Sequence, residues 1–234
     1  MGCVVPLSFL EGVMSIDPKR ELLARKERML SEHLVARGIR DEAVLKAMRE
    51  VPRESFLPPG MELFAYEDGP LPIQEGQTIS QPYIVAYMIE ALELKGEEKV
   101  LEIGTGSGYA AAVLSLCAAE VFTVERIASL ARQADERLRE LGYRNVTVHL
   151  GDGTLGWQEH APYDGIVVTA GAPKVPEELE RQLAPGGRLV IPVGPTPHLQ
   201  DLIRVRRLKS GELRRENLCA VRFVPLIGEK GWEY

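Results

Sequence analysis

Glycine occupies every second position from Gly104 to Gly108, directly after a mostly apolar run. That run, Val100 to Ile103, has the length and composition of a buried strand, and small residues in a helical pattern follow the glycines. Glycine has no Cβ atom, so a turn built from it lets a ligand approach the backbone closely. A strand, a glycine-rich turn and a helix in this order predict a ligand site at the carboxyl end of a strand in an open α/β sheet.

Short apolar segments alternate with helical patterns through the centre of the chain. We expect strands at residues 99–104, 120–125, 146–151, 163–170 and 187–194, with helices at 82–94, 108–118, 127–141 and 176–184. This alternation predicts right-handed crossovers and a parallel sheet covered on both faces. The last third of the chain departs from this alternation. We expect strands of an antiparallel edge at residues 201–211, 212–220 and 221–228. The fold class is therefore α/β, doubly wound and mostly parallel.

The N-terminal part is expected to be helical and then irregular. Apolar residues recur at helical spacing over residues 17–37, and a shorter helix is expected over 41–51. Residues 52–82 hold six prolines and no strong periodicity, which indicates a substrate-side surface. We expect residues 1–16 to be weakly ordered, with Met14 an alternative start, and residues 17–234 to form one domain. Its parts are a helical and substrate-side segment (17–82), a ligand-binding core (83–194) and C-terminal strands (195–234).

The net charge of −6 and the sequence pI near 5.4 argue against a general nucleic-acid-binding surface. Basic residues do cluster at positions 204–209, but apolar residues are interleaved with them. This pattern favours a solvated edge strand over a basic patch. We therefore expect no nucleic-acid partner.

The three cysteines are widely separated, and the four histidines are equally dispersed. Neither a disulfide framework nor a metal site is predicted, and this cysteine usage is typical of a reducing cytoplasm. The mildly apolar N-terminus has no basic region and is too short to span a bilayer. We therefore expect a cytoplasmic protein that is not bound to a membrane.

The spacing of the glycines separates two classes of nucleotide ligand. The dinucleotide fingerprint is G-x-G-x-x-G, whereas this chain has G-x-G-x-G preceded by Glu102. The shorter turn and the acidic residue suit a ligand with an amino group and no phosphate, such as S-adenosylmethionine. Glu125, at the end of the next expected strand, would accept the hydroxyls of a ribose in either class. Asp152, beside Gly153, would receive an adenine amine. Each acid alone is more often a turn or cap residue, but their order at successive strand ends favours the ligand interpretation.

From about residue 20 the sequence resembles the protein-L-isoaspartate (D-aspartate) O-methyltransferases. The motifs that carry the resemblance are GQTISQP (76–82), VLEIGTGSGY, FTVER, GDG, YDGIVVTAGAP, LAPGGRLVIPVG and VRFVPL. GQTIS-x-P upstream of the glycine motif is specific to this family, whereas the glycines alone would indicate only a methyltransferase. The resemblance implies a seven-stranded Rossmann-like sheet and transfer of a methyl group from S-adenosylmethionine, without a metal, to leave S-adenosylhomocysteine.

The resemblance also implies roles for individual residues. It makes Ser80 the active-site hydroxyl, although a serine before Pro82 is also a typical helix cap. With the glycine motif and the acids, the expected donor site comprises Thr78, Ile79, Glu102, Gly104, Thr105, Gly106, Gly108, Glu125, Asp152 and Gly153. The expected peptide site comprises Ser80, Gln81, Tyr83, Pro192, Val193 and Gly194. Tyr83 departs from the histidine common in the family, so a role for that imidazole does not carry over.

The activity implied is methylation of the free carboxylate of L-isoaspartyl, and also D-aspartyl, residues in damaged proteins by a monomeric enzyme. Two alternatives remain open. One is a methyltransferase for a small molecule or RNA on the same core, and the other is an adenosyl-binding module without catalysis. An NAD oxidoreductase fits less well, because of the glycine spacing.

Overall fold

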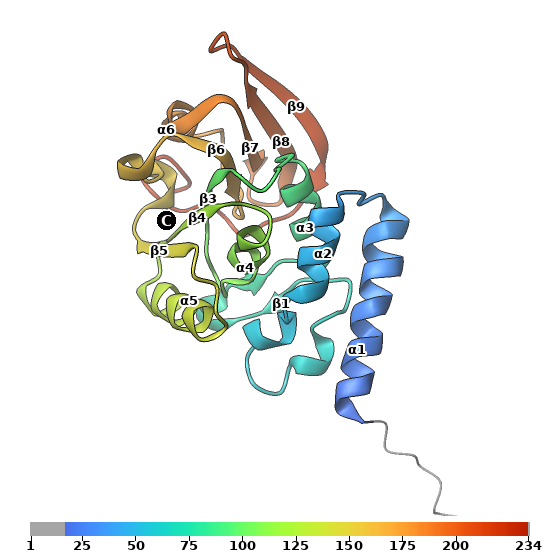
Figure 1. The fold of residues 1–234 in the computed structure, drawn as a ribbon. Helices are drawn as coiled ribbons and strands as arrows, with labels where there is room; N and C mark the ends of the chain where they lie inside the picture. The colour runs from blue at the N-terminus through green and yellow to red at the C-terminus, as the bar shows by residue number, and fades with distance from the viewer. Residues whose placement is uncertain (1–16, 234) are drawn as a thin grey trace, which may run out of the picture.

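The computed structural model describes residues 17–233, so the weak order expected for residues 1–16 lies outside the described part. Seven strands form the main sheet in the order β5-β4-β3-β6-β7-β8-β9 (Figure 1). In chain order they are β3 (Lys99–Ile103), β4 (Glu120–Glu125), β5 (Val146–Leu150), β6 (Tyr163–Val168), β7 (Leu183–Thr196), β8 (Leu199–Arg207) and β9 (Leu213–Val221). The first five are parallel, and β8 and β9 are antiparallel. The predicted fold class is confirmed.

Three details of the sheet differ from the sequence-based expectation. Strand β7 begins at Leu183 rather than at residue 187, because Leu183 already pairs with Tyr163 of β6. Strand β8, expected at the edge, lies between β7 and β9 and is paired on both sides. Of residues 221–228, expected as a strand, Val221 ends β9 and pairs with β8, whereas residues 222–228 make only isolated bridges, such as Gly171 to Pro225.

The helices follow the expected order. They are α1 (Pro18–Arg28), α2 (Glu42–Glu50), α3 (Pro82–Glu90), α4 (Tyr109–Ser115), α5 (Ala128–Glu140) and α6 (Glu177–Gln182). Helix α1 begins after the Asp17 cap and continues as a π-helix and a 3-10 turn to Gly38, whose φ of +103° ends it. The Asp41 carboxylate caps α2 by accepting from two backbone N–H groups. No helix among residues 17–233 is both long and apolar enough to cross a membrane.

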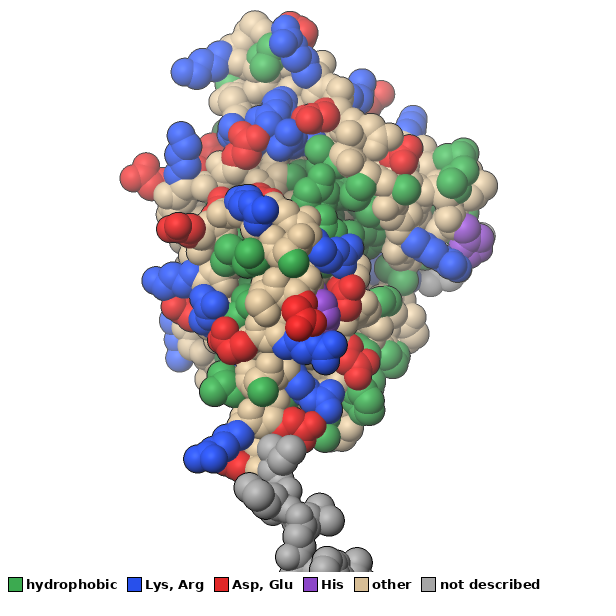
Figure 2. Space-filling view, turned by 90° about the vertical axis from the view of Figure 1, so that its right-hand side faces the viewer, with side chains coloured by type: hydrophobic (Ala, Val, Ile, Leu, Met, Phe, Trp, Pro, Cys, Tyr) green, Lys and Arg blue, Asp and Glu red, His purple; other side chains and the backbone are tan. Residues whose placement is uncertain are grey.

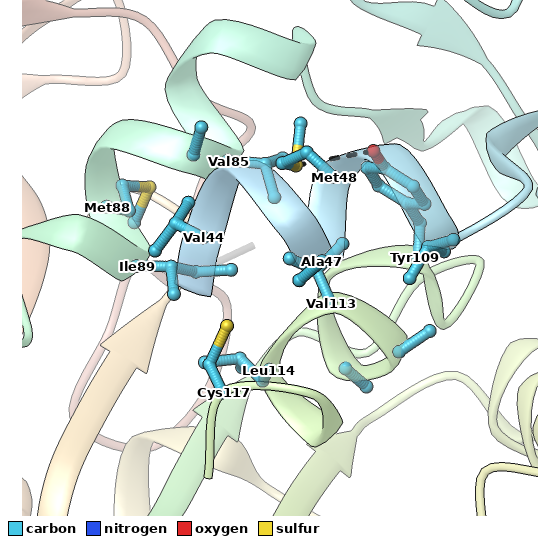
Figure 3. Packing of buried hydrophobic residues seen from close by; sticks show 14 of the residues in the cluster. Val44, Ala47, Met48, Val85, Met88, Ile89, Tyr109, Val113, Leu114 and Cys117 are labelled. Carbon is cyan, nitrogen blue, oxygen red and sulfur yellow. Dashed lines mark hydrogen bonds between the residues drawn. The ribbon is translucent and has the colours of Figure 1, made fainter. Parts of the chain in front are cut away.

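The sheet buries side chains on both faces because alternate strand residues point to opposite sides. Val100 and Val167 pack toward the helical layer of α1 to α5, whereas Leu101 and Ile166 pack on the side of α6. Figure 3 shows the first of these layers, where side chains of α2, α3 and α4 meet. The hydroxyl of Tyr109, at the start of α4, lies 3.5 Å from the sulfur of Met48 in α2. These contacts fix the N-terminal helices to the helix that follows the glycine turn.

Residues 52–82 contain no long element, as predicted. Three 3-10 turns occur there, at Arg53–Phe56, Glu62–Phe64 and Gln74–Gly76. A short antiparallel pair, β1 (Leu71–Pro72) with β2 (Thr78–Ile79), was not predicted. It holds the GQTIS segment immediately before α3.

Candidate active site

The glycine turn after β3 adopts backbone conformations that favour glycine. Gly104, Gly106 and Gly108 have φ values of +96°, +53° and +89°. A Cβ atom on Gly104 would overlap the side-chain oxygen of Thr169, at the end of the neighbouring strand β6. Thr169 Oγ1 in turn donates to the carbonyl oxygen of Gly104 at 2.8 Å. The ends of β3 and β6 are thereby held together at the carboxyl edge of the sheet.

Glu125, the last residue of β4, is tied to the glycine turn. Its Oε2 accepts from the Gly106 N–H at 2.9 Å, and its Oε1 accepts from the Ile127 N–H at 3.0 Å. The residue is only 6% exposed, yet it borders a cavity. A carboxylate has about four acceptor positions, so each oxygen can still accept from a ligand hydroxyl. This geometry suits the predicted ribose contact.

Glu102 lies fully buried in β3. Its Oε2 accepts from the Thr123 hydroxyl at 2.5 Å, and Thr123 is 2.6 Å from the hydroxyl of Thr105. Its Oε1 has no hydrogen-bond partner among residues 17–233. Burial, together with the negative charge of Glu125, raises the pKa of Glu102 to about 8. A cation bound nearby would favour the ionised form of Glu102.

Two cavities lie at the carboxyl edge of the sheet. The donor-side cavity, named for its expected ligand, is lined by Gln77, Thr78, Ile103, Gly104, Gly106, Val124, Glu125, Arg126, Ile127, Gly153, Thr169, Ala170, Val224, Pro225, Leu226 and Ile227. The peptide-side cavity is lined by Arg37, Pro70, Thr78, Ser80, Gln81, Tyr83, Ile84, Thr169, Pro197, His198 and residues 219–225. Their volumes are about 70 and 900 Å³. The two share Thr78, Thr169, Val224 and Pro225, so a group bound in one cavity can reach a group bound in the other.

The GQTIS segment and the start of α3 form one wall of the peptide-side cavity. The Ser80 hydroxyl makes no hydrogen bond within the described chain, and α3 begins after Gln81 without a side-chain cap. The capping alternative for Ser80 is therefore wrong, and the hydroxyl is available to a substrate. The Gln81 side-chain amide donates to Asp68 Oδ1 at 2.7 Å. Tyr83 stacks on Tyr87 with ring centroids 5.7 Å apart.

Asp152 and Gly153 follow β5 and have different surroundings. Gly153 lines the donor-side cavity. Asp152 accepts hydrogen bonds from the N–H and the hydroxyl of Thr154 and from the N–H of Glu229. Its carboxylate therefore anchors the C-terminal loop, and its contact with an adenine stays a prediction.

Several expected site residues lie behind the cavity walls. Ile79 and Thr105 are buried, Gly108 packs against α5 as the cap of α4, and none of these three lines either cavity. The structure does not bring Pro192, Val193 and Gly194 to the peptide-side cavity. Pro192 and Gly194 are buried in β7 and hydrogen-bonded to Ala172, while Val193 lines a separate groove beside α6. Pairing of β7 with β8 directs this stretch into the sheet.

The C-terminal segment supplies a wall that the sequence analysis did not assign. Gly171, just after β6, donates to the Val224 carbonyl and accepts from the Leu226 N–H, both at 2.8 Å. These bonds place residues 222–227 beside Thr169, over the glycine turn. Thr169 was also missed, although its position near the end of an expected strand (163–170) was a usable signal. Among residues 17–233, no group of His, Cys, Asp or Glu side chains could hold a metal ion.

The chain matches the model of one protein family, described as protein-L-isoaspartate(D-aspartate) O-methyltransferase, over residues 24–231. The chain belongs to this family. It is 66% identical over 219 residues to protein-L-isoaspartate O-methyltransferase 1 of Geotalea uraniireducens (strain Rf4), covering 94% of this chain and 100% of that one. It is 67% identical over 208 residues to protein-L-isoaspartate O-methyltransferase 2 of Pelobacter propionicus, covering 89% and 92%.

Solved structures of the same family are similar in fold. One protein-L-isoaspartate O-methyltransferase superposes with a TM-score of 0.80 at 34% identity, covering 88% of this chain and 67% of that one. A Plasmodium falciparum protein assigned to the same activity, solved with S-adenosyl-L-homocysteine, superposes with a TM-score of 0.72 at 27% identity. That match covers 87% of this chain and 98% of the other.

The residues present fit an S-adenosyl ligand in their chemistry. Glu125 offers acceptors for ribose hydroxyls, the buried Glu102 has an unpartnered oxygen, and the glycine turn leaves backbone exposed to the donor-side cavity. The Glu125 carboxylate on the cavity wall, with the acidic side chain of Glu102 buried nearby, suits a sulfonium cation better than a pyrophosphate. A nucleoside is larger than the donor-side cavity as it stands, so we expect its walls to part on binding.

Proposed function

We propose that this chain is a protein repair enzyme that methylates the free carboxylate of L-isoaspartyl residues in damaged proteins, with S-adenosylmethionine as the methyl donor. The observation that carries the proposal is the junction of the two cavities at Thr78 and Thr169, with the free Ser80 hydroxyl on the peptide side. The names and high identity of the relatives support the same activity.

The reaction requires little acid–base catalysis by the protein. When bound, S-adenosylmethionine supplies an electrophilic methyl group on a sulfonium. The attacking carboxylate is already ionised at neutral pH, so no strong general base is needed. The protein has to align the carboxylate with the methyl group and exclude water from two opposite charges that disappear together.

The chain's own groups match these tasks. Glu125 accepts a hydrogen bond from the Gly106 N–H and so fixes the glycine turn that lines the donor-side cavity. Ser80 donates its hydroxyl hydrogen to the substrate carboxylate and fixes its direction, without removing a proton. Thr78 and Thr169, which line both cavities, border the path of the methyl group.

Further properties are proposals on the same basis. We expect activity on D-aspartyl residues as well, a monomeric state, a cytoplasmic location and no nucleic-acid partner. Residues 17–234 would act as one methyltransferase domain, with the donor bound mainly by residues 83–194. The net charge of −6 supports the absence of a nucleic-acid partner.

The test is transfer of labelled methyl from S-adenosylmethionine to an isoaspartyl peptide and to its normal aspartyl twin. Wild type should methylate only the isoaspartyl peptide. Ser80→Ala should lower kcat about 10- to 100-fold, because it removes a hydrogen bond to a charged group, and should leave donor affinity unchanged. Ser210→Ala, in an exposed turn, is the matched control. Donor binding with no methylation of either peptide would refute the proposal and favour a small-molecule or RNA substrate.

A further inference from the structure

The peptide-side cavity has a cationic rim in a protein of negative net charge. Its lining includes Arg37, His198 and Arg222 and no Asp or Glu. On the face drawn in Figure 2, hydrophobic side chains gather in a hollow, and basic and histidine side chains lie on the lobe beside it. A groove of this kind favours a peptide that carries negative charge.

The two arginines of this rim differ in how far their charge is compensated. Arg37 forms an ion pair with Asp68 at 3.0 Å, and its guanidinium carbon lies 3.7 Å from the Tyr83 ring centroid. Arg222 pairs with no carboxylate among residues 17–233, and its Nη2 lies 3.3 Å from His198 Nδ1. Arg222 is thus the uncompensated cation of the cavity.

A buried glutamine holds Arg222 and His198 together. Gln200 is 3% exposed, its Nε2 donates to the carbonyls of Pro197 and Phe223, and its Oε1 accepts from the Phe223 N–H. These bonds join the loop that carries His198 to the segment that carries Arg222. The positions of Arg222 and His198 are therefore fixed by the fold rather than by contacts on the surface.

The distance from the reaction site fixes which substrate residues Arg222 can reach. Val224 borders both cavities, and Arg222 precedes it by two residues, at most about 7 Å between Cα atoms. An extended peptide advances about 3.3 Å per residue. A carboxylate carried one to three residues from the methylated position would therefore lie within range of the guanidinium.

We infer that Arg222, with His198 beside it, is a specificity-determining residue that favours isoaspartyl segments with an acidic side chain within three residues of the damaged one. The inference rests on the proposed function, because it concerns the peptide methylated at the same site. An exposed guanidinium–carboxylate pair of this kind changes kcat/KM by about two- to fivefold, and salt screens it.

The test compares isoaspartyl peptides that differ only in flanking residues, with Glu, Gln or Lys placed one to three positions on either side. Wild type, Arg222→Gln and Arg222→Glu are measured for kcat/KM at low and high salt. Arg144→Gln, an exposed arginine before β5, is the control. Affinity for S-adenosyl-L-homocysteine is measured for each variant to show that the donor side is intact.

We expect wild type and Arg144→Gln to prefer the Glu peptides about two- to fivefold over the Gln peptides, Arg222→Gln to lose the preference, and Arg222→Glu to prefer the Lys peptides. Equal rates on Glu and Gln peptides by wild type, or an unchanged preference in Arg222→Gln, would overturn the inference and leave the proposed function standing. If wild type methylates none of the isoaspartyl peptides, the proposed function fails and the inference falls with it.

Discussion

Replacing Glu102 with Gln should change how the stability of the protein depends on pH. Burial raises the pKa of this carboxyl from 4.5 to about 8. At about 1.4 kcal/mol per pKa unit, this difference corresponds to about 5 kcal/mol between the two protonation states. The folded protein holds the Glu102 proton more tightly than the unfolded chain does. The stabilisation of the folded state by this proton is therefore complete below pH 4.5 and is lost as the pH rises through 8.

Between pH 5.5 and pH 8 the Glu102 carboxyl is ionised in the unfolded chain and largely neutral in the folded protein, which should remove about 3 kcal/mol from the free energy of unfolding of the ligand-free protein as the pH rises. Gln cannot ionise, and its side-chain oxygen can still accept from Thr123. The variant should therefore become more stable relative to wild type by about 3 kcal/mol across this range. Any destabilisation by the substitution that does not depend on pH cancels when the two ends of the pH range are compared.

The assay is urea denaturation of wild type and Glu102→Gln at several pH values from 5.5 to 8, without donor. Glu120→Gln, at the exposed start of β4, is the control and should follow wild type. If the free energy of unfolding of Glu102→Gln changes with pH as that of wild type does, within about 0.5 kcal/mol, the assignment of a neutral, buried Glu102 is refuted.

Two further substitutions test the donor side. Glu125→Gln should weaken binding of S-adenosyl-L-homocysteine about 10- to 100-fold in calorimetry, since an amide oxygen cannot replace both carboxylate oxygens toward Gly106 and Ile127; unchanged affinity would contradict this role. Gly104→Ala should lower the free energy of unfolding by about 2–4 kcal/mol, whereas Gly142→Ala, with a similar φ of +88° and open space around it, should cost only about 1 kcal/mol. Equal costs at the two glycines would show that the overlap with Thr169 does not matter.

The parallel part of the fold could be predicted because its signals are local. Apolar runs such as 99–104 and 120–125 are interrupted by helical patterns, and each became a strand of the sheet. Features that depend on distant partners could not be predicted. Residues 221–228 have strand-like composition, but the main sheet ends at β9, which stops at Val221, and the rest of this segment bonds to Gly171 instead.

Buried polar groups show the same limit. Arg53 is completely buried, donates to the Ala65 carbonyl at 2.7 Å and lies 4.8 Å from the Tyr109 ring centroid. In the sequence it stands among prolines and charged residues, where an arginine is normally exposed. Only the packing of residues 52–66 against α4 reveals its position.

The candidate site was predicted best where chain order and spatial order agree. Gly104, Gly106 and Glu125 follow successive strands, so they meet at one edge of the sheet. Arg222 and His198 come from segments whose direction is set by Gln200, and no local pattern indicates it. Pro192 and Gly194 belong to a motif of the family, but strand pairing places them inside the sheet.

The shared wall of the two cavities limits how this enzyme can diversify. A substitution at Val224 or Pro225 that reshapes the peptide-side cavity also alters the space for the methyl donor. Such a change therefore affects the binding of both substrate and donor. Positions 37, 198 and 222 line the peptide side alone. Variation in substrate preference among related enzymes should therefore accumulate at these outer positions, while the wall between the cavities stays constant.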